Sequence, residues 1–355
     1  MKSLVIHAAK DLRIEDTDPV SPGTDELVVT TAVGGVCGSD LHYYNHGGFG
    51  PITLKEPMIL GHEVSGRVAE LGSKDLGFDV GDLVAISPSR PCYHCSYCHK
   101  GQHNHCENMQ FYGSAMPMPH IQGAFRQQLT VKASQCVIAN DPTAAEAAMA
   151  EPFAVTLHAC NRAGSLLGKK VLITGCGPIG VLSAIAARRA GASEIVATDI
   201  AENALKIAET CGVDKTLNVL DTPDSLEAYS KGKGYFDAMF ECSGNVQALT
   251  AGIATLKPRS VLMQLGLGGD MSLPMMQLTA KEIDLRGSFR FHPEFKTAVK
   301  LMTARLADVS PLITHTVELK DAETAFTIAN DRSVAMKAQI RFCLLYTSPS
   351  PRDRG

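Results

Sequence analysis

Short runs of alternating apolar and polar residues fill roughly the first 150 positions of the chain. They include ELVVTTAVGGV at 26–36, HEVSGRVAEL at 62–71 and GDLVAI at 81–86, and glycine and proline separate them. Alternation with period two is typical of strands that bury one face, and glycine and proline mark the turns between strands. The pattern therefore predicts a β-rich first domain.

From about residue 168 the pattern changes to apolar strands that alternate with stretches of helical period. The predicted strands are KKVLITG at 169–175, EIVATD at 194–199, FDAMFECSG at 236–244, SVLMQLG at 260–266 and IDLRGSF at 283–289. Helical periods follow the first two strands, at 178–192 and 201–212, and a further helical stretch ends near Lys257. This order predicts a parallel, doubly wound sheet with at least five buried strands.

The last third of the chain contains two further elements and an unusual tail. A helical period runs from about 293 to 306, and VAMKAQIRF at 334–342 alternates like a strand that could rejoin the first domain. The tail CLLYTSPSPRDRG at 343–355 fits neither pattern. We expect this tail to be disordered or non-native.

Length and composition narrow the function classes. A chain of 355 residues is too long for one ordinary core, so two domains are expected. A formal net charge of −4 gives no reason to expect nucleic acid or an anionic membrane as partner, and no run reaches 18 apolar residues. Seven cysteines are scattered singly, which favours reduced thiols and a cytoplasmic protein.

Four further cysteines lie inside one short segment, PCYHCSYCHKGQHNHC. The gaps between Cys92, Cys95, Cys98 and Cys106 are two, two and seven residues. Four thiolates at this spacing predict a closed structural zinc site with no open position for a substrate. An iron–sulfur cluster would require a last gap of three residues and a following proline. The nearby histidines could also act as ligands, but sulfur is preferred in a closed site; they are His94, His99, His103 and His105.

A glycine-rich turn predicts a dinucleotide site. The sequence GCGPIG follows an apolar strand and opens a helix, with glycines at 175, 177 and 180 and Pro178 and Ile179 in the turn. Such a turn lets the backbone and the helix N-terminus approach a pyrophosphate. Asp199 ends the next strand, where its carboxylate could accept hydrogen bonds from the adenosine ribose. Because Ile200 rather than arginine follows, NAD is preferred and NADP remains possible. The alternative is a glycine-rich turn in an α/β protein that binds no nucleotide.

A second metal site can be proposed from residues that are far apart in sequence. Cys37 follows a strand and His62 begins another, while Glu151 lies in AEPFAV. Cysteine, histidine and a carboxylate would leave a fourth position open, as catalytic zinc requires. From spacing alone a buried cysteine, a core histidine and a salt-bridged glutamate explain these residues equally well.

The motif GHE at 61–63, the four-cysteine segment, GCGPIG and the distances between them resemble the zinc-dependent medium-chain alcohol and polyol dehydrogenases, over residues 1 to about 342. The resemblance implies a GroES-like catalytic domain at 1–154, completed by about 292–342, and a Rossmann domain at 155–291. It implies that Cys37, His62 and Glu151 bind a catalytic zinc. Glu63 is the rival third ligand, acting directly or through water. Two zinc ions per chain and NAD are the implied cofactors.

Within that family the chain resembles the polyol branch, and most closely the enzymes that oxidise L-idonate to 5-dehydrogluconate. Gly38 stands where several alcohol dehydrogenases carry a cation. The segments that carry this resemblance are CGSDLHYY at 37–44, FYGSAMPMPHIQGAF at 111–125 and RGSFRF at 286–291. Sorbitol and xylitol dehydrogenases match the first and last segments and are the alternative. A non-catalytic protein that binds NAD or zinc is a third reading.

The resemblance also implies roles for residues around the metal. Ser39 would take the proton of the alcohol and relay it, through a ribose hydroxyl, to His42, while hydride passes to the nicotinamide. The implied substrate contacts are Tyr43, Glu151 and Arg290, and the implied nicotinamide walls are Leu265, Gly266, Leu267, Ser288 and Phe289. A turn serine, a surface histidine and an arginine at a domain interface are the alternative readings. A homodimer or homotetramer is the family expectation.

Overall fold

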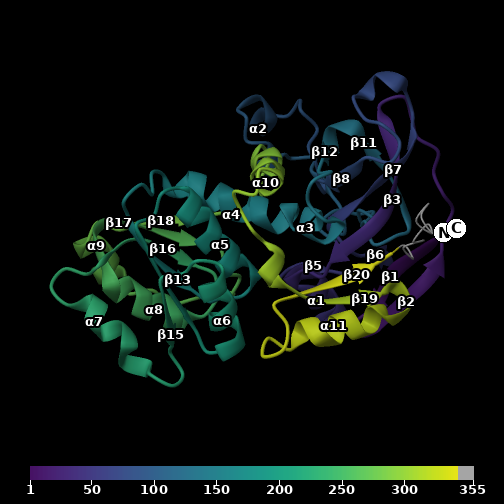
Figure 1. The fold of residues 1–355 in the computed structure, drawn as a ribbon. Helices are drawn as coiled ribbons and strands as arrows, with labels where there is room; N and C mark the ends of the chain where they lie inside the picture. The colour runs from purple at the N-terminus through teal and green to yellow at the C-terminus, as the bar shows by residue number, and fades with distance from the viewer. Residues whose placement is uncertain (343–355) are drawn as a thin grey trace, which may run out of the picture.

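The computed structural model describes residues 1–342. The tail at 343–355, predicted to be disordered or non-native, lies outside the described residues. The chain forms two halves, with a β-rich half on the right of Figure 1 and an α/β half on the left.

The β-rich half is built around a seven-stranded sheet with the path β12-β8-β7-β3-β20-β19, to which β11 is added beside β3. The strands are β3 (Glu26–Gly35), β7 (Glu63–Leu71), β8 (Leu83–Ile86), β11 (Gln128–Lys132), β12 (Cys136–Ile138), β19 (Ile313–Glu318) and β20 (Lys337–Arg341). Three of them lie on the predicted segments of the first domain. Strand β20 pairs antiparallel with β3, with Ile340 opposite Gly34, so the predicted return of the chain end to the first domain is confirmed.

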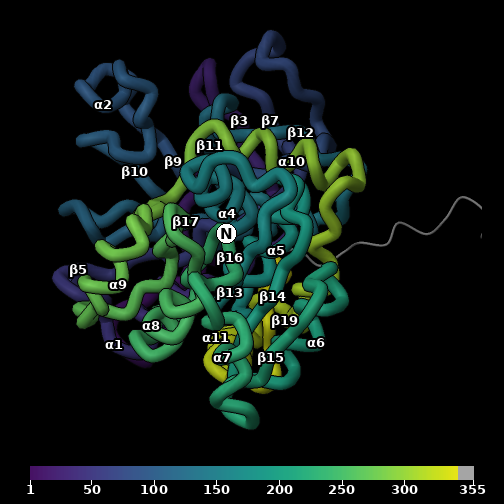
Figure 2. The backbone as a smooth tube through the Cα atoms, turned by 90° about the vertical axis from the view of Figure 1, so that its left-hand side faces the viewer, coloured from purple at the N-terminus to yellow at the C-terminus, as the bar shows by residue number. Residues whose placement is uncertain are grey.

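Shorter elements complete this half. Three strands form a separate sheet: β1 (Lys2–Ala8), β2 (Asp11–Asp16) and β6 (Met58–Ile59). Two small ladders consist of β4 (Gly48–Phe49) with β5 (Ile52–Thr53), and β9 (Ser89–Arg90) with β10 (Gln110–Phe111). The helices here are α1 (Gly38–His46), α2 (Ser96–His99), α3 (Ala144–Ala148) and α11 (Ala322–Asn330). The segment around α2 lies at the edge of the molecule in both Figure 1 and Figure 2.

The other half is a parallel sheet of six strands in the order β15-β14-β13-β16-β17-β18. The strands are β13 (Lys170–Thr174), β14 (Glu194–Asp199), β15 (Lys215–Asn218), β16 (Phe236–Glu241), β17 (Leu256–Gln264) and β18 (Asp284–Gly287). The chain runs from β13 outward to β15 and then returns to β16, so the strand order reverses between β13 and β16. A ligand of such a sheet binds at the carboxyl ends of the strands beside this point. Sequence reasoning missed β15, whose residues KTLN carry no apolar run.

Helices cover both faces of this sheet, and two further helices join the halves. The covering helices are α5 (Pro178–Arg189), α6 (Glu202–Thr210), α7 (Glu227–Ser230), α8 (Val246–Thr255) and α9 (Met275–Ala280). Between the halves lie α4 (Ala150–Ala163) and α10 (Glu294–Thr303), which pack against each other. Glu294 on α10 contacts His158 Nδ1 at 3.1 Å and accepts a hydrogen bond of 3.0 Å from Asn161 on α4. The helix predicted at 293–306 is therefore present; the exact domain boundaries stay a prediction.

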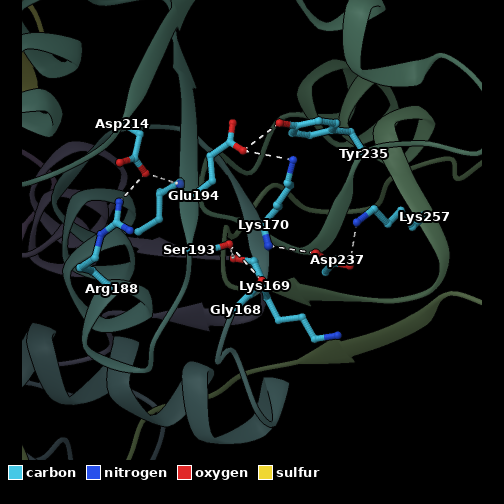
Figure 3. A network of polar contacts seen from close by, with 11 residues as sticks. Gly168, Lys169, Lys170, Arg188, Ser193, Glu194, Asp214, Tyr235, Asp237 and Lys257 are labelled. Atoms are coloured by element: carbon cyan, nitrogen blue, oxygen red, sulfur yellow. Dashed lines mark hydrogen bonds and ion pairs between the residues drawn. The ribbon is translucent and has the colours of Figure 1, made fainter.

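A network of polar contacts connects the amino ends of the central strands, opposite their carboxyl ends (Figure 3). Lys170 lies 3.4 Å from Glu194 and 3.8 Å above the ring of Tyr235. Asp237 accepts a hydrogen bond from the Lys170 amide at 2.9 Å and one from Lys257 at 3.0 Å. Charged side chains at this edge hold β13, β14 and β16 in register and leave the carboxyl ends free for binding.

No helix in residues 1–342 is long and apolar enough to cross a membrane.

Candidate active site

Cys37 is placed at the end of β3 by a short helix and a buried carboxylate. It is the N-cap of α1, and Asp40, in the first turn, accepts a 3.0 Å hydrogen bond from the Cys37 amide. The other oxygen of Asp40 accepts a 3.2 Å hydrogen bond from the amide of Gly61. Asp40 is completely buried. Its carboxylate thus joins the two segments that carry Cys37 and His62, as expected of a bracing rather than a reacting residue.

Two glycines make room for the side chains of the GHE motif. Gly61 has φ +92°, and an added Cβ would lie 2.0 Å from the ring of Phe125. A Cβ at Gly35, opposite Glu63 in the sheet, would lie 2.3 Å from the carboxylate of Glu63. Larger residues at either position would move the backbone of the motif.

The thiol of Cys37, one ring nitrogen of His62 and a carboxylate oxygen of Glu63 lie within 4.8 Å of one another. His62 and Glu63 are buried, and His62 Nδ1 has no hydrogen-bond partner and lies 3.8 Å from Asp40. Burial, followed by the charge of Glu63, raises the pKa of Cys37 to about 12. The group is therefore a set of donors of the kinds that bind zinc.

Glu151 faces the same group from the first turn of α4. Burial raises its pKa to about 8; His62 opposes that rise, whereas the charges of Glu63 and Cys37 add to it. These interactions indicate that the Glu151 carboxyl lies beside the donor set. The three side chains whose donor atoms lie within 4.8 Å of one another, however, are Cys37, His62 and Glu63.

Lys337 on β20 distinguishes the two glutamates. Its ammonium group donates to both oxygens of Glu63 at 2.8 Å and to the Val36 carbonyl at 3.2 Å, and the pair is fully buried. No hydrogen bond from a described residue engages Glu151 in this way. Glu63 is therefore already neutralised by a lysine, which leaves Glu151 the carboxylate without a partner. Sequence reasoning did not find Lys337, because it lies 274 residues from Glu63.

The residues present fit a zinc ion. Cys37, His62 and either glutamate supply sulfur, nitrogen and oxygen donors, and cysteine, histidine and glutamate are all common zinc ligands. Cys37, Glu63 and Glu151 lie around one buried point. Lys337 is the lysine whose charge lowers the pKa values of Cys37 and Glu151. A divalent cation would balance this charge.

Ser39 and His42 share one side of α1, because residues three apart on a helix are neighbours. Both are half-buried. The ring of His42 lies 5.5 Å from that of Phe49, and burial, assisted by His46, lowers the pKa of His42 below 6.5. His42 is thus neutral and able to accept a proton at neutral pH.

Arg290 extends over aromatic rings beside this centre. Its guanidinium lies 4.2 Å from the centre of the Phe111 ring and 4.9 Å from that of Phe289, and it donates to the Met116 sulfur at 3.5 Å. Burial lowers its pKa to about 10, against the charges of Glu151 and Tyr43. Arg290 forms no ion pair with any carboxylate in residues 1–342. A half-buried cation that forms no hydrogen bond or ion pair with a described carboxylate is suited to bind an anionic substrate group.

The segment between Phe111 and Phe125 is anchored beneath Arg290. The Tyr43 hydroxyl, which is buried, accepts a 3.0 Å hydrogen bond from the Ala115 amide. His120 is also buried, and its Nε2 accepts a 2.9 Å hydrogen bond from the Lys55 amide. His120 is therefore a buried anchor of this segment and not an exposed loop residue. Tyr43 supports the segment, and its contact with a substrate stays a prediction.

The glycine-rich turn joins β13 to α5. Gly175 has φ +87°, and a Cβ on Gly180 would lie 1.8 Å from the Gly175 carbonyl oxygen, so strand and helix approach closely. Gly177 is the N-cap of α5 and faces open space, which would admit a pyrophosphate. Pro178 and Ile179, half-buried, form the first turn of the helix.

Asp199 ends β14 beside this turn. Its carboxylate accepts hydrogen bonds from the amides of Cys176 at 2.6 Å, Ile200 at 2.7 Å and Ala201 at 2.9 Å. These donors hold the carboxylate at the position predicted for the adenosine ribose. Its role in binding a dinucleotide stays a prediction.

The predicted nicotinamide walls follow β17 and β18. Leu267 is 83% exposed and Phe289 is 47% exposed, so both are available for contact, while Leu265, Gly266 and Ser288 are half-buried. A residue that sequence reasoning missed organises this edge. Glu241, at the end of β16, is completely buried and accepts hydrogen bonds from the amides of Ser243 and Gly244 and from Gln264. Its signal in the sequence is an acidic residue at the carboxyl end of the strand FDAMFE.

The four cysteines meet at the edge of the molecule, in a segment that we call the cysteine lobe (residues 92–106). Their sulfur atoms lie within 4.8 Å of one another. The amide of His94 is the main group that lowers the pKa of Cys92, to about 6, whereas burial raises that of Cys98 to about 12. Four thiolates this close need a cation, and the donor set fits a closed zinc site.

Two family models match the chain: the alcohol dehydrogenase GroES-like domain over residues 23–141 and the zinc-binding dehydrogenase over residues 178–304. The L-idonate 5-dehydrogenase (NAD(P)(+)) of Escherichia coli strain K12 is 43% identical over 347 residues, covering 96% of this chain and 98% of that protein. The chain belongs to the zinc-dependent medium-chain dehydrogenases. Members of this family use zinc and NAD(P). The predicted family, fold and cofactors are confirmed.

A second relative and a solved structure extend the comparison. The sorbitol dehydrogenase of Bos taurus is 34% identical over 345 residues, covering 96% of this chain and 95% of that protein. A crystal structure of the Escherichia coli K-12 L-idonate 5-dehydrogenase superposes with a TM-score of 0.89 at 39% identity, covering 96% of this chain and 97% of that one. The idonate relative is thus more similar than the sorbitol one, in the order predicted from the sequence segments.

Proposed function

We propose that this dehydrogenase oxidises a secondary hydroxyl of a sugar acid, L-idonate to 5-dehydrogluconate, and reduces NAD or NADP. The observation that carries the proposal is Arg290, a half-buried cation over the ring of Phe111 that forms no hydrogen bond or ion pair with a carboxylate of the described chain. An aldonate brings a carboxylate that matches it, whereas a neutral polyol does not. The similarity to an L-idonate 5-dehydrogenase supports the same substrate.

Cys37, His62 and Glu151 would hold the catalytic zinc in this proposal, and Glu63 would stay paired with Lys337. When bound, zinc supplies Lewis-acid chemistry that favours loss of a hydroxyl proton near neutral pH. Ser39 accepts that proton at its Oγ while releasing its own hydroxyl proton toward His42, on the same side of α1, and His42 exchanges a proton with solvent. Arg290 orients the substrate through its carboxylate, and Phe111 and Phe289 keep water away from the guanidinium.

The oxidation removes two electrons and two hydrogen nuclei from the substrate, one as a hydride and one as a proton. The carbon bearing the hydroxyl loses a hydride to NAD(P)⁺, the hydroxyl loses its proton to Ser39, and the products are a ketone, NAD(P)H and a proton. The glycine-rich turn and Asp199 would hold the dinucleotide, with Leu265, Gly266, Leu267, Ser288 and Phe289 around its nicotinamide.

The direct test is NADH or NADPH formation, followed by absorbance, with L-idonate, sorbitol and xylitol, together with zinc analysis. We expect two zinc ions per chain and a higher kcat/KM for L-idonate than for either polyol. Preference for sorbitol or xylitol would support the polyol alternative. One zinc ion and no turnover of any of the three would favour a non-catalytic protein and refute the proposal.

We also propose a cytoplasmic location and assembly into a homodimer or homotetramer. Every cysteine among residues 1–342 is a free thiol, which suits a reducing compartment. Strand β18 pairs with β17 on one side only and ends the six-stranded sheet, so its other edge could pair with a second copy. Light scattering of the purified protein would measure the assembly; a monomer at micromolar concentration would contradict it.

A further inference from the structure

Besides an edge-on contact of the Tyr93 ring with that of His292 at 6.0 Å, the cysteine lobe contacts the segment that carries Arg290 at three places. The side-chain amide of Asn104 donates a 3.0 Å hydrogen bond to the carbonyl of Phe289, and Asn104 is buried. The ring of His105 stacks on that of Phe289 at 6.1 Å, and the ring of His103 stacks on that of His292 at 4.3 Å. All three contacts come from one 3₁₀ turn, His103–His105, inside the lobe.

Arg290 lies between these contacts in a backbone conformation that needs support. Its φ is +54°, in the left-handed region that a residue with a side chain rarely adopts. Such a residue persists only where its surroundings hold it. Phe289, directly before Arg290, and His292, two residues after it, are held by the turn of the cysteine lobe, and the guanidinium lies over Phe111.

The rest of the segment is held by the α/β half of the molecule. The amide of Ser288 donates a 3.1 Å hydrogen bond to the Gln264 carbonyl, and Glu294 is tied to α4. Both ends of the segment are therefore fixed independently of the lobe, and only the stretch around Arg290 depends on it.

We propose that the cysteine lobe positions the substrate-binding arginine, and that Asn104 is the positioning residue. The metal of the lobe then contributes to substrate affinity as well as to stability, because it fixes the turn that carries Asn104. The inference rests on the proposed role of Arg290 in substrate binding.

The test compares Asn104→Ala and Asn104→Asp with Ser96→Ala as a matched control. Ser96 lies in the same lobe and donates to Glu107, away from Arg290. We expect both Asn104 variants to raise KM for L-idonate, and its Kd for the enzyme–NADH complex, about 3- to 10-fold, the range expected for one lost hydrogen bond. The kcat, the KM for NAD, the zinc content and Tm should stay close to wild type. Ser96→Ala should change none of these quantities.

A double variant separates positioning from a general structural effect. In an Arg290→Met background, Asn104→Ala should raise KM no further, because its effect passes through Arg290. An unchanged KM and Kd in the single Asn104 variants would overturn the inference. So would an additive effect in the Arg290→Met background, or a joint rise of the KM values for L-idonate and NAD.

A chemical readout does not depend on the substrate. Phenylglyoxal modifies accessible arginines, and mass spectrometry can follow the rate at Arg290 relative to the exposed Arg67. Asn104→Ala should raise the relative rate at Arg290 several-fold, and Ser96→Ala should not. This result would support the positioning role even if the wild-type protein failed to oxidise L-idonate, whereas an unchanged rate would overturn it.

Discussion

The two groups of metal-ligating side chains differ in how far apart their members lie along the chain. The cysteine lobe draws its donors from 15 consecutive positions, Cys92 to Cys106, and backbone amides near the sulfurs already favour the thiolate form of Cys92. The other group joins Cys37 and His62 to Glu151 and Lys337, and burial raises the pKa of its thiol to about 12.

This difference shows which site can form early and which needs the completed fold. The cysteine lobe can bind its metal as soon as this one loop closes. A buried centre assembled from distant strands cannot exist until β3, β7, β20 and α4 have packed together. The local site should therefore influence stability, and the dispersed site should influence catalysis.

The largest expected effect comes from Cys37→Ala. Loss of the catalytic metal should lower kcat/KM by about 10³-fold or more, because its Lewis acidity stabilises the transition state by several kcal/mol. Zinc content should fall from two ions to one, and the lobe should keep its ion. Cys211→Ala, which removes a half-buried thiol elsewhere, is the control. Retained activity in Cys37→Ala would refute the assignment of this centre.

Replacing Lys337 tests how the fold stabilises the buried carboxylate of Glu63. Lys337→Met leaves Glu63 buried without its partner, which should destabilise the metal-free protein by about 3–5 kcal/mol. Zinc should restore part of this stability, because Glu63 could then face the ion. Denaturant unfolding with and without zinc measures both values, and Glu63→Gln combined with Lys337→Met is the control. An equal loss with and without zinc would show that Glu63 does not reach the metal.

The cysteine lobe should respond in the opposite way to the catalytic centre. Cys98→Ser should lose one zinc ion and lower Tm by roughly 3–4 °C, the shift that a loss of about 2–3 kcal/mol gives in a chain of this size. Part of the activity should remain, since no donor of the catalytic centre is changed. Thermal unfolding and zinc analysis measure the effect, with Ser96→Ala as control. An unchanged Tm would argue against a structural role.

The smallest expected effect concerns Asp199, which lies beside the glycine-rich turn that is predicted to bind the dinucleotide. Asp199→Gly removes a carboxylate that would repel a ribose 2′-phosphate. The ratio of kcat/KM for NADP to that for NAD should rise about tenfold, which corresponds to 1.4 kcal/mol. Steady-state kinetics with both cofactors give this ratio, and Asp221→Gly, on a nearby exposed loop, is the control. A constant ratio would remove Asp199 from the adenosine site.

Local patterns of the sequence were sufficient for much of the fold. Alternation located β3, β7, β8 and β20, and apolar runs located five of the six parallel strands. The short strand β15 was missed because its residues are polar, and α1 and α11 were not anticipated because their helical periods are brief.

The sequence by itself determined the cysteine lobe and the glycine-rich turn, because each is encoded by residue types at fixed short spacings. Only the tertiary structure decided that Lys337 neutralises Glu63, that Asp40 joins the Cys37 and His62 segments, and that the lobe supports the backbone around Arg290. These contacts connect residues tens to hundreds of positions apart. Their geometry follows from the packing of strands and helices in three dimensions, which the periodicity of the sequence does not predict.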